Sequence, residues 1–366
     1  MTAAARHMAR ALELAARGKF TTHPNPRVGC VIVRDGRVVG EGWHRQAGEP
    51  HAEVLALREA GDDARGAEVY VTLEPCAHVG RTPPCADALV AAGVGKVFAA
   101  MRDPFPRVAG RGLEKLRAAG IEVEVGIMEG EARVLNRGFV SRFERGRPYL
   151  ILKLAMSLDG RTAMASGESR WITGEAARED VHRLRAEAGA VLTTSATVLA
   201  DDPELTVRLP PASSGAWRQP DRIVIDSRGR VPLGAKVWAL GARRFALVPQ
   251  ALAGQRVAEG VETIGLEVTA HGAIPLPAAL RALGAREINE VLVECGPRLA
   301  GALLQAGLVD QLVIYVAPKL LGDAARPLVA LPGLERLGDH IALEYVSAER
   351  IGDDMKITAR VAEKRA

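Results

Sequence analysis

The sequence predicts an α/β protein of two domains, and three observations lead to that expectation. The chain has 366 residues, which is more than one hydrophobic core usually fills. Short apolar runs alternate with segments of helical periodicity in both halves, as expected where helices cover a sheet. A polar stretch with glycine and proline, residues 144–148, interrupts this alternation. We therefore expect one domain over residues 1–146 and a second over residues 147–366.

The composition is that of an ordinary globular protein, with 48% hydrophobic and 25% charged residues. The net charge of +4 is spread without a basic block, and aromatic residues make up only 4%, which argues against nucleic acid as the main partner. Charged residues interrupt the first apolar positions, so a signal peptide is excluded, and no apolar run has the length of a membrane span. The four cysteines show no disulfide framework. We expect a cytoplasmic protein.

The first half predicts helices and strands that alternate along the chain. Asp35-Gly36 between two apolar runs is the signal of a tight hairpin. Pro83-Pro84 precedes a helical segment that Gly93 should end. The expected elements are a helix ending near residue 18, strands over 28–33 and 37–42, a helix over 51–59, a strand over 69–73, a helix over 85–92, a strand over 97–101, a helix over 113–119, a strand over 121–125 and one helix over 129–143.

The second half starts again with a strand and repeats the alternation. Expected are strands over 149–155, 190–194, 222–226, 290–294 and 311–317, with helices over 175–186 and from Pro297 to Ala306. We expect the strand over 311–317 to close the sheet.

The most informative stretch runs from His51 to Cys85. It contains His51-Ala52-Glu53, then Glu74-Pro75-Cys76, and Cys85 after a gap of eight residues. This is the His-x-Glu…Pro-Cys…Cys pattern of zinc-dependent nucleobase deaminases, although their usual gap between the cysteines is two residues. A catalytic zinc takes three protein ligands and leaves one position open. The pattern predicts His51, Cys76 and Cys85 as ligands, and Glu53 as the group that moves protons.

A structural zinc is the alternative, and it would require a fourth ligand, for which His44 and His78 are the nearby candidates. Regular helix geometry does not bring together two residues separated by one position. His51 and Glu53 can therefore converge only at an irregular first turn after Pro50. A bound zinc would activate water to attack a ring carbon that carries an amine, with Glu53 transferring the proton to the leaving ammonia. Asn25 could contact the ring, although a turn between two prolines explains it as well.

Six longer motifs resemble one family, the bifunctional riboflavin-biosynthesis deaminase/reductases. The resemblance covers nearly the whole chain, and the gap of eight residues between the cysteines is the pattern of this family. The motifs are Thr21-Thr22-His23-Pro24-Asn25-Pro26-Arg27-Val28-Gly29-Cys30, Gly48-Glu49-Pro50-His51-Ala52-Glu53, Thr72-Leu73-Glu74-Pro75-Cys76, Gly80-Arg81-Thr82-Pro83-Pro84-Cys85, Ser157-Leu158-Asp159-Gly160-Arg161-Thr162 and Ala200-Asp201-Asp202-Pro203.

The resemblance implies two consecutive reactions and two cofactors. A cytidine-deaminase-like three-layer domain with one zinc would deaminate 2,5-diamino-6-(5-phosphoribosylamino)pyrimidin-4(3H)-one. A domain resembling dihydrofolate reductase would then use NADPH to reduce the ribosyl group to ribityl. Family substrate positions fall on Asn25, His44, Ser169, Arg185, Leu205, Arg208 and Glu294. Family cofactor positions fall on Ala155, Trp171, Thr197, Asp201, Ser227 and the run Gly296, Pro297, Arg298, Leu299, Ala300, Gly301 and Ala302. A homodimer through the reductase domain is a further family expectation.

Physical reasoning about the second half adds three hypotheses. The strand, glycine and helix start around Gly296 suit a phosphate, although an ordinary joint between strand and helix looks the same, and no Rossmann fingerprint is present. Arg228 beside Ser227 could bind a 2′-phosphate. Lys153 and Asp201 are the polar groups expected near the carbon that receives hydride. Two other classes remain open: a nucleic-acid editing deaminase with an accessory domain, and a deaminase fused to a regulatory nucleotide-binding domain.

Overall fold

The computed structural model describes residues 1–77, 84–106, 108–210, 217–255 and 258–362. The chain divides into two compact units, Met1–Gly146 and Arg147–Ala366, which are described separately below. Among the described residues, no helix is long and apolar enough to cross a membrane.

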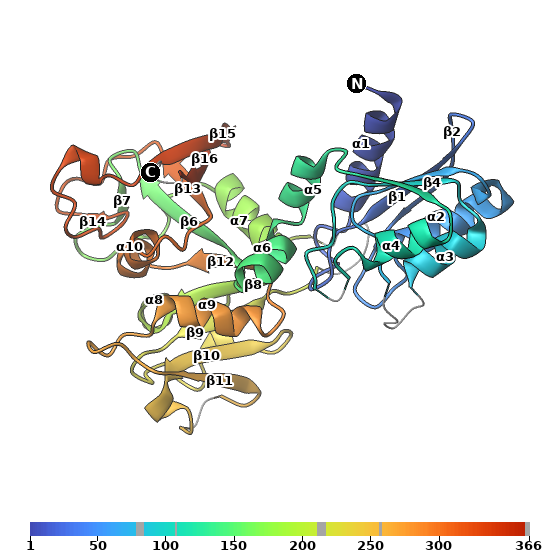
Figure 1. Cartoon of the computed structure of the whole chain (residues 1–366). Helices are drawn as coiled ribbons and strands as arrows, with labels where there is room; N and C mark the ends of the chain where they lie inside the picture. The colour runs from blue at the N-terminus through green and yellow to red at the C-terminus, as the bar shows by residue number, and fades with distance from the viewer. Residues whose placement is uncertain (78–83, 107, 211–216, 256–257, 363–366) are drawn as a thin grey trace. The chain divides into compact units, whose positions relative to one another are not determined.

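The first unit is a layered α/β structure built on a five-stranded sheet with the order β2-β1-β3-β4-β5 (Figure 1). Strand β1 is antiparallel to β2 and β3, whereas β3, β4 and β5 are parallel. In chain order the elements are α1 (Ala3–Ala16), β1 (Gly29–Arg34), β2 (Arg37–Trp43), α2 (Ala52–Ala60), η1 (Gly61–Ala64), β3 (Glu68–Val71), α3 (Cys85–Ala92), β4 (Lys96–Ala99), α4 (Arg111–Ala118), β5 (Glu122–Val125), α5 (Glu129–Leu135) and α6 (Arg137–Arg145).

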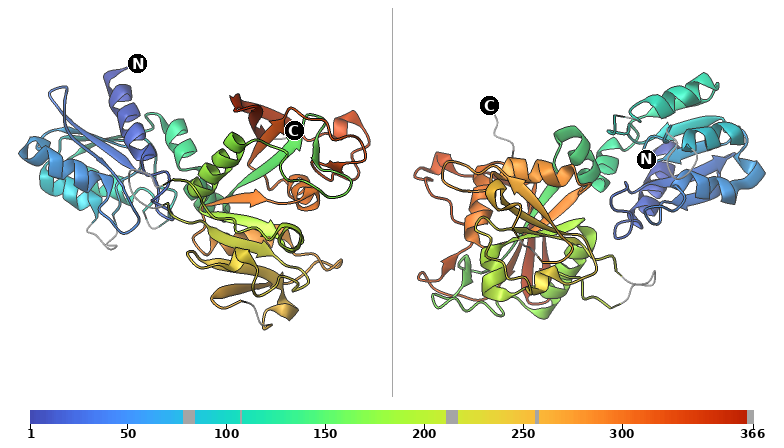
Figure 2. Two further views of the ribbon diagram at one scale, coloured as in Figure 1. Left: turned by 180° about the vertical axis from the view of Figure 1, so that it is seen from behind. Right: turned by 90° about the horizontal axis from the view of Figure 1, so that it is seen from below.

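Alternate residues of the central strand β1 enter two different cores, as strand geometry requires. Cys30 and Ile32 pack in the core formed with α2, α3 and α4. Val31 and Val33 pack in the core formed with α1, α5 and α6. Helices therefore cover both faces of the sheet, and the predicted three-layer arrangement is confirmed (Figure 2).

Most predicted elements of this unit are confirmed. The hairpin turn has positive φ angles at Asp35 (47°) and Gly36 (74°), and α3 ends at Gly93 with a φ of 68°. The single helix predicted over 129–143 is wrong, because Asn136 separates α5 from α6 with a φ of −107° and a ψ of 22°. Its buried side chain instead accepts a hydrogen bond from the Arg27 N–H (2.8 Å) and donates to the Arg27 carbonyl (2.9 Å).

The second unit has a nine-stranded sheet with the order β11-β10-β9-β8-β12-β6-β13-β16-β15, and a separate pair, β14-β7. The sheet is parallel from β11 to β13, and β16 and β15 add an antiparallel edge. The elements are β6 (Tyr149–Ser157), β7 (Arg161–Ala163), α7 (Glu175–Glu187), β8 (Ala190–Thr194), α8 (Ser195–Asp201), β9 (Asp221–Ile225), η2 (Lys236–Trp238), β10 (Arg244–Pro249), η3 (Gln250–Leu252), β11 (Val261–Leu266), α9 (Leu276–Gly284), β12 (Glu290–Glu294), α10 (Pro297–Gln305), β13 (Gln311–Ala317), β14 (Arg326–Pro327), η4 (Leu337–Asp339), β15 (Leu343–Ile351) and β16 (Asp354–Val361).

This sheet also separates two cores, one with α9 and α10 and the other with α7. The prediction that residues 311–317 close the sheet is wrong, since β16 and β15 lie beyond β13. The parallel strands β8, β12 and β6 are neighbours, so their carboxyl ends meet at one edge of the sheet. Polar residues that follow or end these strands are therefore brought together there.

Candidate functional site

The three predicted metal ligands lie at the ends of secondary-structure elements in the first unit. His51 is the N-cap of α2, with an extended φ of −73° and ψ of 163°, so it precedes the regular helix. Cys85 is the first residue of α3, and Cys76 lies in the segment after β3. Because His51 is extended and lies outside the regular helix, helix periodicity does not prevent its side chain from lying near that of Glu53.

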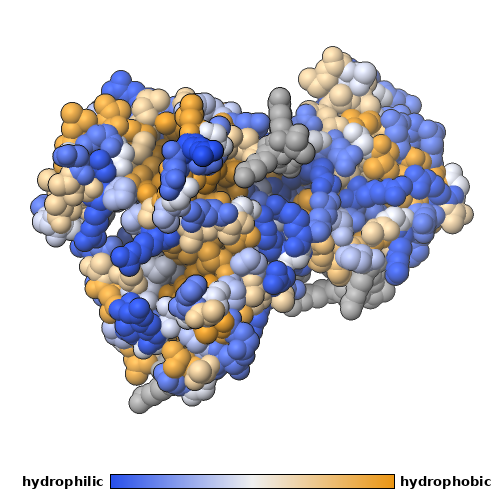
Figure 3. Space-filling view, turned by 60° about the vertical axis from the view of Figure 1, so that its left-hand side comes forward, coloured by the Kyte–Doolittle hydropathy of each residue, from blue (hydrophilic) through white to orange (hydrophobic). Residues whose placement is uncertain are grey.

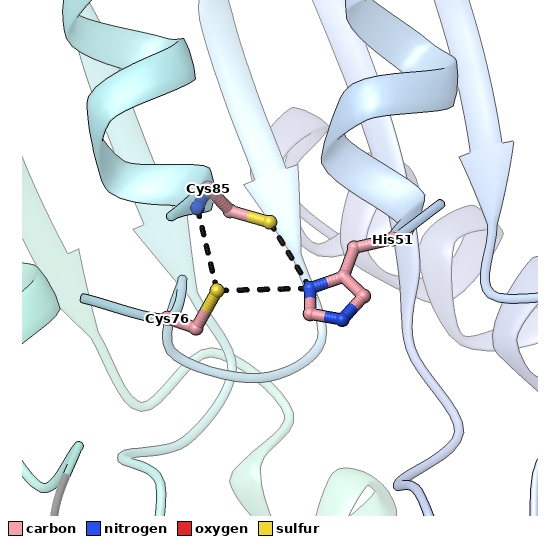
Figure 4. A group of neighbouring side chains, drawn as sticks. All are labelled: His51, Cys76 and Cys85. Carbon is pink, nitrogen blue, oxygen red and sulfur yellow. Dashed lines mark hydrogen bonds between the residues drawn. The ribbon is translucent and has the colours of Figure 1, made fainter. Parts of the chain in front are cut away.

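The ligand atoms face one another (Figure 4). His51 Nδ1 lies 3.2 Å from Cys85 Sγ and 3.6 Å from Cys76 Sγ, and all three atoms lie within 4.8 Å of one another. Usual zinc bond lengths to sulfur and imidazole give an N···S edge of about 3.6 Å in a tetrahedron. The donor set and its spacing therefore fit zinc with one open coordination position, and no other such group occurs among the described residues.

The start of α3 favours a thiolate at this place. The Cys85 N–H donates to Cys76 Sγ over 3.3 Å. Hydrogen bonds from Cys85 and His51 lower the pKa of Cys76 to about 4. The neighbouring Cys76 raises the pKa of Cys85, an effect that a bound dication would oppose because it favours both thiolates.

Glu53 is the second residue of α2 and is 3% exposed. Burial raises the pKa of its carboxyl group, although the His51 charge opposes this. Its Oε2 has no hydrogen-bond partner among the described residues. A buried, unsatisfied carboxylate beside the metal ligands is suited to accept and return a proton.

Asn25 and His44, both predicted to bind substrate, are linked to each other by a hydrogen bond. His44 Nδ1 lies 3.2 Å from the Pro50 carbonyl, which can only accept, so this nitrogen carries the proton. His44 Nε2 must then accept from Asn25 Nδ2 at 3.0 Å. Both ring nitrogens are engaged, so His44 is not a fourth ligand, while His78 lies outside the described residues. Because the Asn25 amide nitrogen is bonded to His44, its amide oxygen is the acceptor available to a ligand.

Two buried acids near the metal ligands were not predicted as site residues. Burial raises the pKa of Asp103 to about 7, and the charges of Glu74 and Cys76 act in the same direction. Glu74 is 3% exposed and accepts three backbone N–H bonds. The sequence marks Glu74 only by its place before Pro75-Cys76, and Asp103 only as an Asp-Pro pair after a strand.

A second polar cluster lies at the carboxyl edge of the large sheet, formed by Glu294, Lys153 and Arg185. Glu294 ends β12 and is the register partner of Lys153 on β6. Arg185, on α7, holds Glu294 through two bonds, Nε to Oε1 at 2.6 Å and Nη2 to Oε2 at 3.0 Å, and Lys153 Nζ lies 3.6 Å from Oε2. Although burial acts in the opposite direction, the charges of Arg185 and Lys153 lower the pKa of Glu294 to about 2.

The other predicted substrate residues of this unit lie in the segments before α7 and after α8. Arg185 also donates to the Thr206 carbonyl (3.1 Å), so its guanidinium is held by Glu294 and Thr206 together. The exposed Arg208 guanidinium pairs with Glu204 (3.0 Å). Leu205 has a φ of 55° and a buried side chain, so only its backbone could face a ligand. Ser169 lies in the segment between β7 and α7. Their substrate contacts remain predictions.

The predicted cofactor run begins at the N-terminus of α10. Gly296 is its N-cap, and a Cβ at this position would meet nothing within 4 Å, so the helix start is open. Gly301 is different, since a Cβ there would lie 1.8 Å from the Ala330 carbonyl oxygen. Its missing side chain therefore serves packing. The open first turn fits a phosphate group of NADPH.

Ser227 and Arg228 lie in a turn that follows β9. The Val231 N–H donates to Asp226 Oδ2 over 2.8 Å and closes the turn. Gly229 within it has a φ of 61°. Asp226 Oδ1 is buried without a partner among the described residues. The turn presents a hydroxyl and an exposed guanidinium, as a 2′-phosphate site requires, and this role remains a prediction.

The other predicted cofactor residues lie on two elements, β6 and α8, and in the segment between β7 and α7. Ala155 is on β6, and Thr197 lies in the first turn of α8, where its N–H donates to Thr194 Oγ1 (3.3 Å). Asp201 is the exposed last residue of α8, and it is Asp202 that accepts a bond from the Lys236 N–H (2.9 Å). Trp171 is 65% exposed, and the Arg178 guanidinium lies over its ring, with Cζ 4.7 Å from the ring centroid. On the face drawn in Figure 3, hydrophobic residues gather in a hollow of this unit.

Each unit matches a different protein family. Residues 1–101 match "Cytidine and deoxycytidylate deaminase zinc-binding region", and residues 148–357 match "RibD C-terminal domain". The first match contains His51, Cys76, Cys85 and Glu53. The second contains the cluster around Glu294.

Relatives and solved structures match the whole chain. Riboflavin biosynthesis protein RibD of Escherichia coli is 56% identical, and the match covers 95% of this chain and 97% of that protein. Acinetobacter baumannii RibD has a similar structure, with a TM-score of 0.89, 46% identity, and coverage of 98% of this chain and 99% of the other. A Thermotoga maritima diaminohydroxyphosphoribosylaminopyrimidine deaminase/5-amino-6-(5-phosphoribosylamino)uracil reductase has a TM-score of 0.85 and 34% identity, and covers 98% and 99% of the two chains.

Proposed function

This chain belongs to the RibD family of riboflavin-biosynthesis proteins, and we propose on that premise which of its residues carry each reaction. The chain is a bifunctional enzyme, with a zinc-dependent deaminase and an NADPH-dependent reductase. We assign deamination to residues 1–146 and reduction to residues 147–366. The convergence of His51, Cys76 and Cys85 on one point beside the buried Glu53 carries the first assignment.

The two activities named for the Thermotoga protein indicate the order of the reactions. Deamination of a diaminopyrimidinone replaces one ring amine with a carbonyl and releases ammonia. The product is an aminouracil, which is the compound class named for the reductase. We therefore propose 2,5-diamino-6-(5-phosphoribosylamino)pyrimidin-4(3H)-one as the first substrate and its deaminated product as the second.

In the deaminase, zinc held by His51, Cys76 and Cys85 lowers the pKa of water when bound. Glu53 takes a proton from the attacking water and gives a proton to the departing amine, for which its free Oε2 is available. Asn25, held by His44, presents its amide oxygen to an N–H of the pyrimidine. These residues together orient the ring and move the protons.

In the reductase, NADPH would supply hydride for reduction of the ribosyl group when bound, and the chain's own groups bind and orient the reactants. The open start of α10 at Gly296 receives the pyrophosphate, and Arg208 binds the ribose phosphate. Lys153, held against Glu294, lies at the carboxyl edge of the sheet near the reacting sugar. Asp201 gives or orients the proton that accompanies hydride.

Product mass tests both activities and their order. The zinc-loaded protein is given the diaminopyrimidinone with and without NADPH, beside Glu53→Gln and the surface control Glu122→Gln. We expect an amine-to-carbonyl change without NADPH and two added hydrogens with it. Glu53→Gln should lose deamination by roughly 10²–10⁴-fold, the range for a general acid–base group. Reduction of the undeaminated compound would contradict the order, and unchanged deamination in Glu53→Gln would remove its proton role.

Asp201→Ala tests the reductase assignment with the deaminated compound as substrate. Asp201 matches a family cofactor position, but the role proposed here is in proton transfer. We therefore expect reduction to be lost while NADPH binding, measured by fluorescence titration, stays near normal. Weak NADPH binding with residual turnover would refute this role.

The homodimer expected for the family has one supporting feature here. Strand β15 ends the large sheet, and eight of its nine residues are exposed, with Tyr345 at 78% and Val346 at 53%. Long exposed edges tend to pair with another strand. We propose that a second copy covers β15. Light scattering should show Tyr345→Lys shifted toward the 38.9 kDa monomer, with Leu240→Lys unchanged; equal dimerisation of both variants would exclude this edge.

We further propose a cytoplasmic location, since all four cysteines are unpaired.

A further inference from the structure

Glu74 lies two residues before the metal ligand Cys76, and its carboxylate binds the N-terminus of α4 and the segment that precedes this helix. Its Oε1 accepts the Gly112 N–H at 2.9 Å, and its Oε2 accepts the N–H groups of Gly110 (2.9 Å) and Asp103 (3.2 Å). Gly110 is the N-cap of α4, and Gly112 lies within the first turn. A carboxylate at a helix N-terminus satisfies donors that have no partner within the helix.

A second contact fixes the same loop. A Cβ at Gly112 would lie 1.9 Å from the Pro75 carbonyl oxygen, so only glycine lets α4 approach this peptide so closely. The hydrogen bonds of the Glu74 carboxylate and the close packing of Pro75 against Gly112 thus both hold this loop against α4.

The first turn of α3 holds the other end of the loop. The Ala86 N–H donates to the Cys76 carbonyl (3.1 Å), and the Cys85 N–H donates to Cys76 Sγ (3.3 Å). Cys76 therefore lies between the starts of two helices, and Glu74 makes the contact with one of them. Without that carboxylate, the α4 side would keep only the packing of Gly112 against Pro75, and the three N–H bonds that hold the loop there would be lost.

We propose that Glu74 is a positioning residue for the deaminase, and that it fixes Cys76 in the geometry that binds the metal. The proposal rests on the deaminase function assigned to this unit. Both oxygens of Glu74 accept backbone N–H groups, so its effect on the metal site passes through the loop that carries Cys76. Groups that orient metal ligands typically change metal affinity or activity by roughly 10–100-fold when they are altered.

The test compares Glu74→Gln with Glu122→Gln in the full chain. A glutamine keeps the shape but turns an N–H₂ group toward one of the three N–H donors. We expect zinc to be lost to a chelator roughly 10–100-fold more readily, with kcat for deamination reduced and KM little changed. Reduction of the deaminated compound, measured on the same sample, should match wild type.

Cobalt(II) in place of zinc separates positioning from a general loss of stability. A displaced Cys76 should weaken the sulfur-to-cobalt charge-transfer absorption per bound ion in Glu74→Gln, and Glu122→Gln should keep the wild-type spectrum. If Glu74→Gln retains zinc and the cobalt spectrum as Glu122→Gln does, the proposal is overturned, even where its thermal stability is lower.

Gly112→Ala provides a second route if Glu74→Gln does not fold. It disturbs the same loop from the α4 side, and Gly130→Ala, where a Cβ meets nothing within 4 Å, is its control. The same changes in zinc retention and cobalt absorption are expected, and their absence would overturn the proposal. A wild type that binds zinc but shows no deamination would refute the proposed function alone, because the metal readouts still test Glu74.

Discussion

Three glutamates at or near the two candidate sites differ in role because their surroundings differ. Glu53 has an oxygen without a partner, and burial raises its pKa, as suits proton transfer. Glu74 accepts three backbone N–H groups and is held in place. Glu294 lies between two cations and has its pKa lowered to about 2. The neighbours of each carboxylate, and not burial alone, determine what it can do.

The metal ligands could be predicted from the sequence, whereas the partners of the other two glutamates could not. His51, Cys76 and Cys85 occur in a pattern with helix-start signals around them. The partners of Glu74 are backbone groups up to 38 positions away, and Arg185 lies 109 positions from Glu294. Backbone N–H groups carry no residue signature, and a charged helix such as α7 does not reveal which arginine is paired.

The charge on Glu294 predicts a pH dependence for the stability of the second unit. A folded pKa of about 2 against an ordinary 4.5 means that the carboxylate stabilises the fold above pH 4.5 and loses this effect as the pH falls through about 2. The shift corresponds to roughly 3 kcal/mol. We expect Glu294→Gln to be less stable than wild type at neutral pH, with the difference closing between pH 4.5 and 2.

Urea denaturation at several pH values measures that difference. The control is Glu262→Gln, which removes an exposed partner of Arg286 (2.6 Å) in the same unit and should change stability little at any pH. A Glu294→Gln deficit that persists unchanged down to pH 2 would show that the lost stability does not come from the carboxylate charge.

At the scale of the elements, local signals defined some boundaries well and left others hidden. The α3 helix lies between two prolines and a glycine, and its predicted bounds are confirmed. Strand β15 carries charged residues within an exposed edge, so the hydrophobic alternation that marks a strand is weak. The break between α5 and α6 depends on contacts of Asn136 with Arg27, 109 positions earlier, which no local pattern records.

That break predicts a measurable role for Asn136. Its two hydrogen bonds hold the Arg27 backbone, two residues after Asn25, against the helix pair. Asn136→Ala leaves both backbone groups without this partner, and we expect the free energy of unfolding of the first unit to fall by roughly 1–3 kcal/mol. Asn136→Asp keeps the acceptor and should lie between Ala and wild type. Calorimetry of the zinc-loaded chain measures this, and an Ala variant as stable as wild type would contradict it.

At the scale of the whole molecule, the residues proposed for the two reactions lie in different compact units. All three metal ligands lie in Met1–Gly146, and Lys153, Arg185 and Glu294 lie in Arg147–Ala366. Each unit has its own sheet with a core on either face. Folding of the second unit therefore does not require the metal site of the first.

Removal of zinc should accordingly separate the two activities. After treatment with a chelator, we expect deamination to disappear because the water is no longer activated, while reduction of the deaminated compound by NADPH continues at the wild-type rate. Added zinc should restore deamination. Both assays are run on one sample, with zinc content measured in parallel. A reductase rate that falls together with zinc content would show that the metal also supports the second unit, which the separation of the ligand sets and cores argues against.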